Sequence, residues 1–143
     1  MGEMSPLQTG RIVGAALVTA FALIGAPAPL AAAAPCPDVD VVFARGTFEA
    51  PGVGGIGQSF VDAVRSKATG KSVSVYPVNY PASTDFPTAV QGIRDAANHI
   101  EATAASCPNT RIVLGGFSQG AAVAGFVTSE AVPSGASAED VPD

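Results

Sequence analysis

The sequence predicts a three-layer α/β/α sandwich with a parallel sheet. Three short apolar segments alternate with three helical segments in the second part of the chain, in the order strand, helix, strand, helix, strand, helix. Right-handed crossovers between successive strands place such helices on the two faces of a parallel sheet. A Gly-x-Ser-x-Gly motif lies where the third strand turns into the third helix, at the sheet edge where α/β proteins bind ligands.

The first 33 residues have the pattern of a secretory signal peptide. Arg11 is followed by an apolar run over residues 12–25, and the alanine-rich stretch that follows suits cleavage near Ala33. The apolar run is shorter than the ~20 residues that a membrane-spanning helix needs. We therefore expect a secreted, extracellular domain over residues 34–143, with no integral membrane span after cleavage.

Each element is predicted from its pattern of apolar residues. Short β-branched runs favour strands, and apolar residues that recur every three or four positions favour helices. The longest helix has the clearest stripe, formed by Val90, Ile93, Ala97, Ile100 and Ala104. In chain order, the expected elements are a strand at 39–44, a glycine-rich loop at 46–57, a helix at 58–68, a strand at 71–78, a helix at 88–106, a strand at 111–114, a helix at 121–130 and a loop at the C-terminus.

The charge and glycine patterns argue against two classes of ligand. The basic residues are scattered in a chain of net charge −5, so no patch suits the phosphates of nucleic acid. Gly52, Gly54 and Gly57 match the dinucleotide-binding pattern Gly-x-Gly-x-x-Gly, but the strand ends well before Gly52. No acidic residue between Asp62 and Asp85 is available to hold a ribose. We therefore expect a flexible surface loop there, and neither a cofactor nor a metal.

Cys36 and Cys107 are the two cysteines of the chain. An even number in an exported protein favours a disulfide, and two free buried thiols are the alternative. Two or three residues separate each cysteine from a predicted strand, so both lie at the N-terminal edge of the sheet. If the first and third strands are neighbours, the two sulfurs can meet. Such a bridge closes a loop of about 71 residues and contributes roughly 4 kcal/mol to stability in the chain-entropy model.

Ser118 is the candidate nucleophile. A strand that turns directly into a helix strains the backbone at the serine and projects its hydroxyl outward. The residues two before and two after must then be very small, and they are Gly116 and Gly120. The helix that follows directs N–H groups and its positive dipole end at an oxyanion, so the backbone N–H of Gln119 is a natural donor. The alternative is an inert serine in a glycine-rich turn.

Three segments of the chain resemble the cutinase family of secreted serine esterases in sequence, order and spacing. They are VVFARGTFE, which follows a cysteine, YPVNYPAS and SCPNTRIVLGGFSQGA. The resemblance covers essentially the whole mature part. It implies an α/β-hydrolase fold without a large lid that hydrolyses carboxylic esters, including fatty-acyl esters, with a Ser-Asp-His triad. Ser118 matches the family's nucleophile and Gln119 its oxyanion donor, while Thr47 falls where the family has a serine that makes the second oxyanion contact. Cys36 and Cys107 match the family's first disulfide.

The same resemblance implies that the triad Asp and His are absent from this chain. In the family both follow the nucleophile, beyond two more strands, whereas no histidine follows Ser118 here. His99 lies roughly 16 Å along its helix from the active-site edge, at 1.5 Å per residue. A surface pair with Asp95, one helical turn earlier, is therefore its better interpretation. We expect an N-terminal portion of the domain with weak activity, marginal folding and an exposed sheet edge, whose complete form is a monomer.

Two functions from different classes remain open. The first is a secreted carboxylesterase in which Ser118 attacks an ester or lipid carbonyl and Thr47 and Gln119 stabilise the tetrahedral oxyanion. The second is a catalytically impaired exported fragment that binds a lipid or a protein partner. A second chain that supplies the missing Asp and His is a third possibility.

Overall fold

The computed structural model describes residues 35–129. Its elements follow the predicted order, and they are strand β1 (Val39–Ala44), helix α1 (Gly54–Lys67), strand β2 (Val73–Pro77), the 3-10 turn η1 (Phe86–Thr88), helix α2 (Ala89–Ser106), strand β3 (Arg111–Gly116) and helix α3 (Gln119–Val127). The predicted signal peptide and the C-terminal loop lie outside the described residues.

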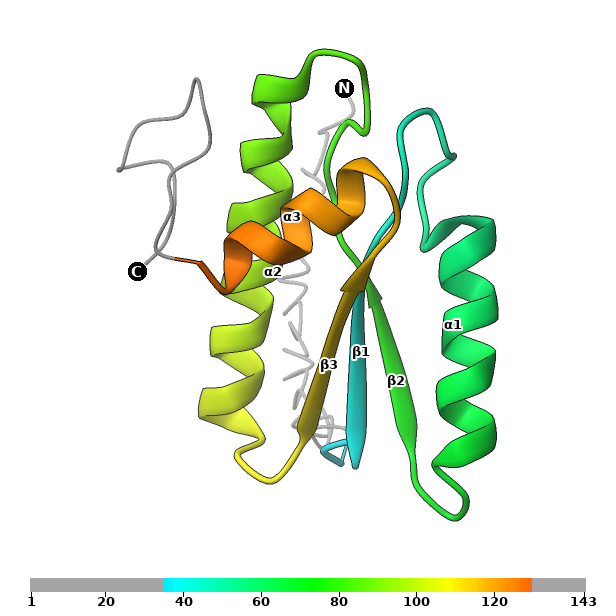
Figure 1. Ribbon diagram of the computed structural model, residues 1–143. Coiled ribbons are helices and arrows are strands. Elements are labelled where there is room, and N and C mark those ends of the chain that lie inside the picture. The colour runs from blue at the N-terminus through cyan, green and yellow to red at the C-terminus, as the bar shows by residue number, and fades with distance from the viewer. Residues whose placement is uncertain (1–34, 130–143) are drawn as a thin grey trace, which may run out of the picture. The chain divides into compact units, whose positions relative to one another are not determined.

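The three strands form one parallel sheet in the order β2–β1–β3. β1 is central, and its Val41 pairs with Val75 of β2 and with Val113 of β3. Because the strands run in the same direction, the loops that follow all three of them meet at one edge of the sheet (Figure 1). This edge carries the predicted active-site residues.

Helices cover both faces of the sheet, with α1 on one face and α2 and α3 on the other (Figure 1). The main core lies between the sheet and α2 and α3, where Val42 of β1 packs with Ile93 of α2 and Val123 of α3. On the opposite face, Phe43 packs against Phe60 of α1 with ring centroids 5.4 Å apart. The alternation along β1 supplies both cores, and the predicted three-layer architecture is confirmed.

Helix α1 begins at Gly54, four residues before the predicted start. Gly54 and Gly57 therefore belong to its first turn, and the prediction that both lie in a flexible loop was wrong. The carboxylate of Glu49 explains the earlier start, because it accepts a hydrogen bond from the Gly55 N–H at 2.9 Å. This contact satisfies one of the N–H groups that a helix leaves unpaired at its start.

Two boundaries near the Gly-x-Ser-x-Gly motif also differ from prediction. β3 continues to Gly116, because β1 pairs with it as far as Ala44. The N–H of Phe117 extends this pairing by donating to the Ala44 carbonyl at 3.0 Å. α3 begins at Gln119 and ends at Val127, so only two residues, Phe117 and Ser118, separate the end of the strand from the start of the helix.

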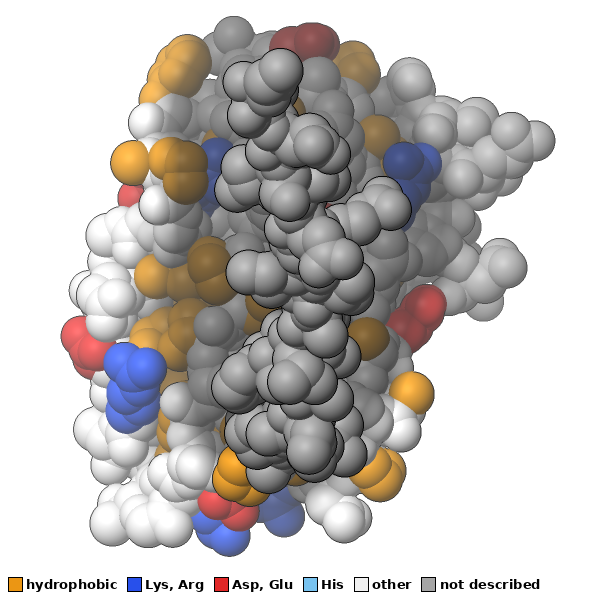
Figure 2. Space-filling view, turned by 180° about the vertical axis from the view of Figure 1, so that it is seen from behind, with side chains coloured by type: hydrophobic (Ala, Val, Ile, Leu, Met, Phe, Trp, Pro, Cys, Tyr) orange, Lys and Arg blue, Asp and Glu red, His pale blue; other side chains and the backbone are white. Residues whose placement is uncertain are grey.

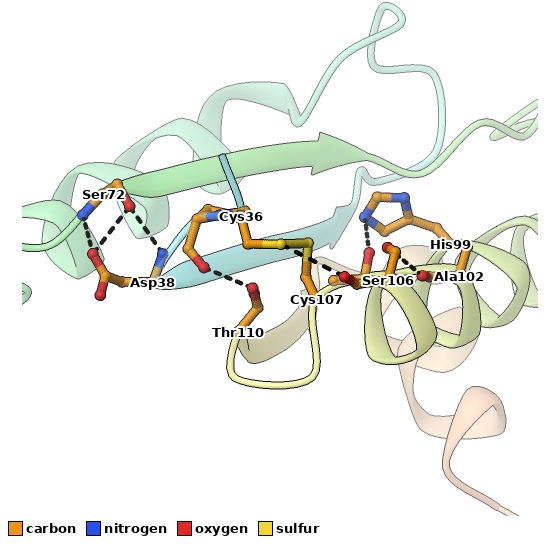
Figure 3. The surroundings of a disulfide bond; sticks show 10 residues. Cys36, Asp38, Ser72, His99, Ala102, Ser106, Cys107 and Thr110 are labelled. Atoms are coloured by element: carbon orange, nitrogen blue, oxygen red, sulfur yellow. Dashed lines mark hydrogen bonds between the residues drawn. A yellow bond between two sulfur atoms is a disulfide. The ribbon is translucent and has the colours of Figure 1, made fainter. Parts of the chain in front are cut away.

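The Cys36–Cys107 disulfide forms as predicted, at the N-terminal edge of the sheet (Figure 3). The bridge is possible because β1 and β3 are neighbours, with Val39 paired to Arg111. The hydroxyl of Thr110 donates to the Pro37 carbonyl at 2.6 Å and ties the same two segments together.

His99 does not pair with Asp95, and this prediction was wrong. Its Nε2 lies 2.6 Å from Oδ2 of Asp40 in β1. Asp95 instead accepts hydrogen bonds from the Tyr76 hydroxyl at 3.1 Å and from the Asn79 N–H at 2.8 Å. The physical reason is the packing of α2 on the sheet, where strand side chains reach both residues and the Tyr76 ring stacks on the imidazole with centroids 3.6 Å apart.

Charged side chains do not gather on the side of the molecule seen in Figure 2. The visible Lys and Arg side chains lie apart from one another, and Asp and Glu side chains lie between them. Within residues 35–129, no helix combines the length and the apolar character that crossing a membrane requires.

Candidate active site

Ser118 lies in the turn between β3 and α3, at the C-terminal edge of the sheet. Its backbone has φ 54° and ψ −119°, which non-glycine residues rarely adopt. Two close backbone approaches hold this turn, since a Cβ on Gly116 would overlap the Gly120 carbonyl and a Cβ on Gly120 would overlap the Ala44 carbonyl. The result is a strained serine whose side chain is exposed to solvent.

Two backbone N–H groups near this serine have no acceptor among residues 35–129. One belongs to Gln119 at the start of α3, and the other belongs to Thr47 in the loop after β1. The side chains of these two residues meet, with Thr47 Oγ1 3.4 Å from Gln119 Oε1. A helix start favours negative charge through its dipole. The arrangement is therefore suited to binding an oxyanion.

The side chain of Gln119 joins three loops. It is 8% exposed, and its Nε2 donates to the Ser83 carbonyl at 3.0 Å while its Oε1 faces Thr47. The loops after β1, β2 and β3 are thereby connected through a single amide. Sequence analysis considered only the backbone N–H of this residue, because nothing in the local pattern indicates which loop a buried amide reaches.

Arg45 is a buried cation that sequence analysis counted only among the scattered basic residues. Its side chain is 4% exposed, and the guanidinium donates to the Glu49 carbonyl at 2.8 Å and to the Tyr80 carbonyl at 2.6 Å. The Tyr80 hydroxyl donates back to the Arg45 carbonyl. Burial raises the pKa of Tyr80, the Arg45 charge opposes this shift and the Glu49 charge adds to it. The sequence feature that could have revealed this buried role is the position of Arg45 directly after an apolar strand.

Exposed apolar side chains surround this edge of the sheet. Among the described residues, the large hydrophobic side chains that are exposed are Phe48, Ile56, Phe86 and Phe117. They lie in the loop after β1, the first turn of α1, η1 and the Ser118 turn, and each of these segments follows the end of a strand. Exposed apolar groups gathered in one region are typical of ligand or membrane contact.

No base reaches Ser118 within residues 35–129. Its hydroxyl makes no hydrogen bond there. His99 is held by Asp40, whose partner in β3 is Ile112, four residues before the end of that strand. At ~3.3 Å per residue, about 13 Å of strand separates that level from the Ser118 turn. The described residues also contain no group of three His, Cys, Asp or Glu side chains that could hold a metal.

A strained serine between a parallel strand and a helix, flanked by two glycines and followed by a helix whose first N–H has no acceptor among residues 35–129, is typical of serine hydrolases with an α/β fold. The family model of cutinases matches residues 35–141, and this chain belongs to the cutinase family. The resemblance noted in the sequence is thereby confirmed.

Curated relatives are found in mycobacteria. Carboxylesterase Culp1 of Mycobacterium tuberculosis is 53% identical over 133 residues, which cover 91% of this chain and 61% of that protein. Phospholipase Culp4 of the same organism is 49% identical over 122 residues, which cover 85% of this chain and 54% of that protein. The chain therefore spans less than two thirds of the length of these relatives.

Solved structures support the same fold. Trichoderma reesei cutinase in complex with a phosphonate inhibitor superposes with a TM-score of 0.56 at 42% identity, over 62% of this chain and 42% of that one. The catalytic core domain of acetyl xylan esterase from the same fungus superposes with a TM-score of 0.57 at 30% identity, over 62% and 46% of the two chains.

Proposed function

We propose that this chain is a serine carboxylesterase of the cutinase type in which Ser118 is the nucleophile. The observation that carries the proposal is the turn itself, where a serine with positive φ precedes Gln119, whose side chain contacts Thr47. The N–H groups of Thr47 and Gln119 have no acceptor among residues 35–129. Ser118 Oγ forms a bond to the ester carbonyl carbon while its proton passes to solvent, and the two N–H groups bind the oxygen as it becomes negative. The carbonyl then re-forms, the bond to the ester oxygen breaks and the alcohol leaves after taking up a proton from solvent. Removing one such donor typically slows the reaction by about 10²–10³-fold.

The exposed side chains of Phe48, Phe86 and Phe117 favour an ester with an apolar acyl chain as the substrate, because they offer apolar surface for the chain to contact. The names of the relatives, carboxylesterase and phospholipase, agree with esters of this kind. The Cys36–Cys107 disulfide supports an extracellular location, because disulfides persist in oxidising compartments.

The turnover of this chain by itself is expected to be slow. The only histidine of the sequence is His99, which is held by Asp40 at the other end of the sheet. A serine without a base is a weak nucleophile, and an oxyanion site with substrate binding alone leaves about 10³–10⁴-fold catalysis over water.

The test is hydrolysis of p-nitrophenyl butyrate by the full chain and by Ser118→Ala, followed as release of p-nitrophenolate. We expect a small rate above the blank for the unaltered chain and the blank rate for Ser118→Ala, with an acyl adduct on Ser118 detected by mass spectrometry. Equal rates for the two proteins, with no adduct, would contradict the catalytic proposal.

The exposed Phe48, Phe86 and Phe117 side chains favour a second candidate function, the binding of lipid without hydrolysis. The same exposed aromatic side chains would contact the lipid. If this second function is correct, the unaltered chain and Ser118→Ala sediment equally with phosphatidylcholine vesicles, and neither protein cleaves p-nitrophenyl butyrate.

A further inference from the structure

We propose that Glu49 is a positioning residue that holds Thr47 in place to bind the oxyanion. The inference rests on the esterase function proposed above and assigns a role to a carboxylate that takes no part in the reaction itself. Three features carry it, namely the contacts of the carboxylate, the chemistry of its partners and the strained backbone next to Thr47.

The Glu49 carboxylate bridges two segments of backbone. Its Oε2 accepts a hydrogen bond from the N–H of Gly46 at 2.6 Å, and its Oε1 accepts one from the N–H of Gly55 at 2.9 Å. Gly46 directly precedes Thr47, and Gly55 lies in the first turn of α1. The Glu49 N–H also donates to the Gly46 carbonyl at 3.2 Å, which closes a tight turn around Thr47.

Only a carboxylate can satisfy both partners. Each partner is an N–H donor, and an ionised Glu offers two acceptor oxygens, whereas Gln offers one acceptor and one NH₂ group that would face an N–H. The negative charge also lies at the start of α1, where the helix dipole favours it. Residue 54 leaves room for this group, because a Cβ on Gly54 would overlap the Glu49 carboxylate.

The turn that carries Thr47 needs such support. Phe48 has φ 63°, a left-handed conformation that a non-glycine residue keeps only where its surroundings impose it. Its N–H donates to the Ala82 carbonyl at 2.8 Å, so the residue after Thr47 is anchored as well. Thr47 is thus fixed from both sides while its own N–H remains without an acceptor in the described part of the chain. A donor held ready in this way stabilises an oxyanion without further rearrangement.

The experiment measures phosphonylation of Ser118 in the full chain by a p-nitrophenyl alkylphosphonate. Ser118 Oγ forms a bond to phosphorus, p-nitrophenolate leaves, the serine proton passes to buffer, and the phosphonyl oxygen takes the position of the oxyanion. The release of p-nitrophenolate gives a maximal rate and a half-saturating concentration, and the adduct is confirmed by its mass.

Glu49→Gln is expected to lower the maximal rate at least about tenfold, because one oxyanion donor is misplaced. The half-saturating concentration should stay within about twofold, because the exposed apolar side chains that contact the alkyl chain are unchanged. The matched control is Asp38→Asn, which alters a carboxylate that accepts the Ser72 N–H at 2.8 Å at the opposite end of the sheet. Asp38→Asn should leave both values unchanged at a temperature where all variants are folded.

Gly54→Ala provides a second variant, because its added methyl displaces the Glu49 carboxylate without removing its charge. Gly70 has the same φ of 74° with no atom within 4 Å of an added Cβ, so Gly70→Ala controls for the backbone strain. Gly54→Ala should reproduce the loss of rate, and it decides the question if Glu49→Gln does not fold. Phosphonylation of Ser118→Ala at the rate of the unaltered chain overturns the proposed function and this inference together. Loss of labelling in Ser118→Ala, with unchanged rates in the folded Glu49 or Gly54 variant, overturns the role of Glu49 alone.

Discussion

Ser118 keeps its positive φ because α3 approaches both β3 and the end of β1 so closely that only glycine fits at the two contact positions. Gly120→Ala places a methyl against the Ala44 carbonyl, and Gly116→Ala places one against Gly120. We expect Gly120→Ala to lower the free energy of unfolding by about 3 kcal/mol, because backbone atoms cannot move aside as a flexible side chain could. Urea denaturation measures the change.

Gly125→Ala is the matched control on the same helix. A Cβ at Gly125 meets no atom within 4 Å, so alanine should stabilise the protein by about 0.5–1 kcal/mol by restricting the unfolded chain. Similar effects of the two substitutions would show that close approach does not shape the Ser118 turn.

At the scale of elements, helix α2 is attached to the sheet in two different ways. Ile93 and Ala96 are buried in the apolar core, whereas His99 contacts the buried carboxylate of Asp40, which also accepts a hydrogen bond from Ser74. His99 lies on the part of α2 that leads to Cys107 and the disulfide (Figure 3).

His99→Ala is expected to destabilise the protein by about 2 kcal/mol, because the buried Asp40 side chain loses a hydrogen-bond partner. Asn98→Ala, at the neighbouring exposed position, should change stability by less than about 0.5 kcal/mol. Thermal unfolding of the two variants is the measurement. Equal midpoints would mean that the Asp40–His99 contact contributes nothing to the attachment of α2.

At the scale of the whole molecule, the Cys36–Cys107 disulfide encloses β1, α1, β2 and α2 in one covalent loop. The two cysteines are 71 positions apart in the sequence. In the chain-entropy model, a loop of this length contributes about 4 kcal/mol, which is a large share of the stability of a small domain.

Replacing both cysteines with serine should therefore shift the urea midpoint strongly downward, and reductant should do the same to the unaltered protein. The double variant itself should not respond to reductant. A midpoint that reductant leaves unchanged in the unaltered protein would mean that the folded contacts alone hold the sheet.

Local patterns were sufficient to predict the order of the elements and the place of the Ser118 turn. β1 has the predicted bounds, because the mostly apolar run VDVVFA between Asp38 and Arg45 is visible in the sequence itself. The glycines two positions before and after Ser118 can likewise be recognised in the sequence, because they lie within a few residues of the serine. The start of α1 was missed because Gly54 and Gly55 are weak helix formers, and the acceptor that satisfies this end of the helix is the side chain of Glu49, six residues away from Gly55.

Local sequence patterns are enough to specify a parallel α/β sheet of the cutinase family with a serine turn at its C-terminal edge. The surroundings of that serine, and the partners of the polar side chains, depend on how the elements pack. Arg45 meets Tyr80, 35 positions away, and His99 meets Asp40, 59 positions away. Helical and strand periodicity act over a few residues, whereas these partners are brought together by the packing of α2 and the loops on the sheet, which no local pattern encodes.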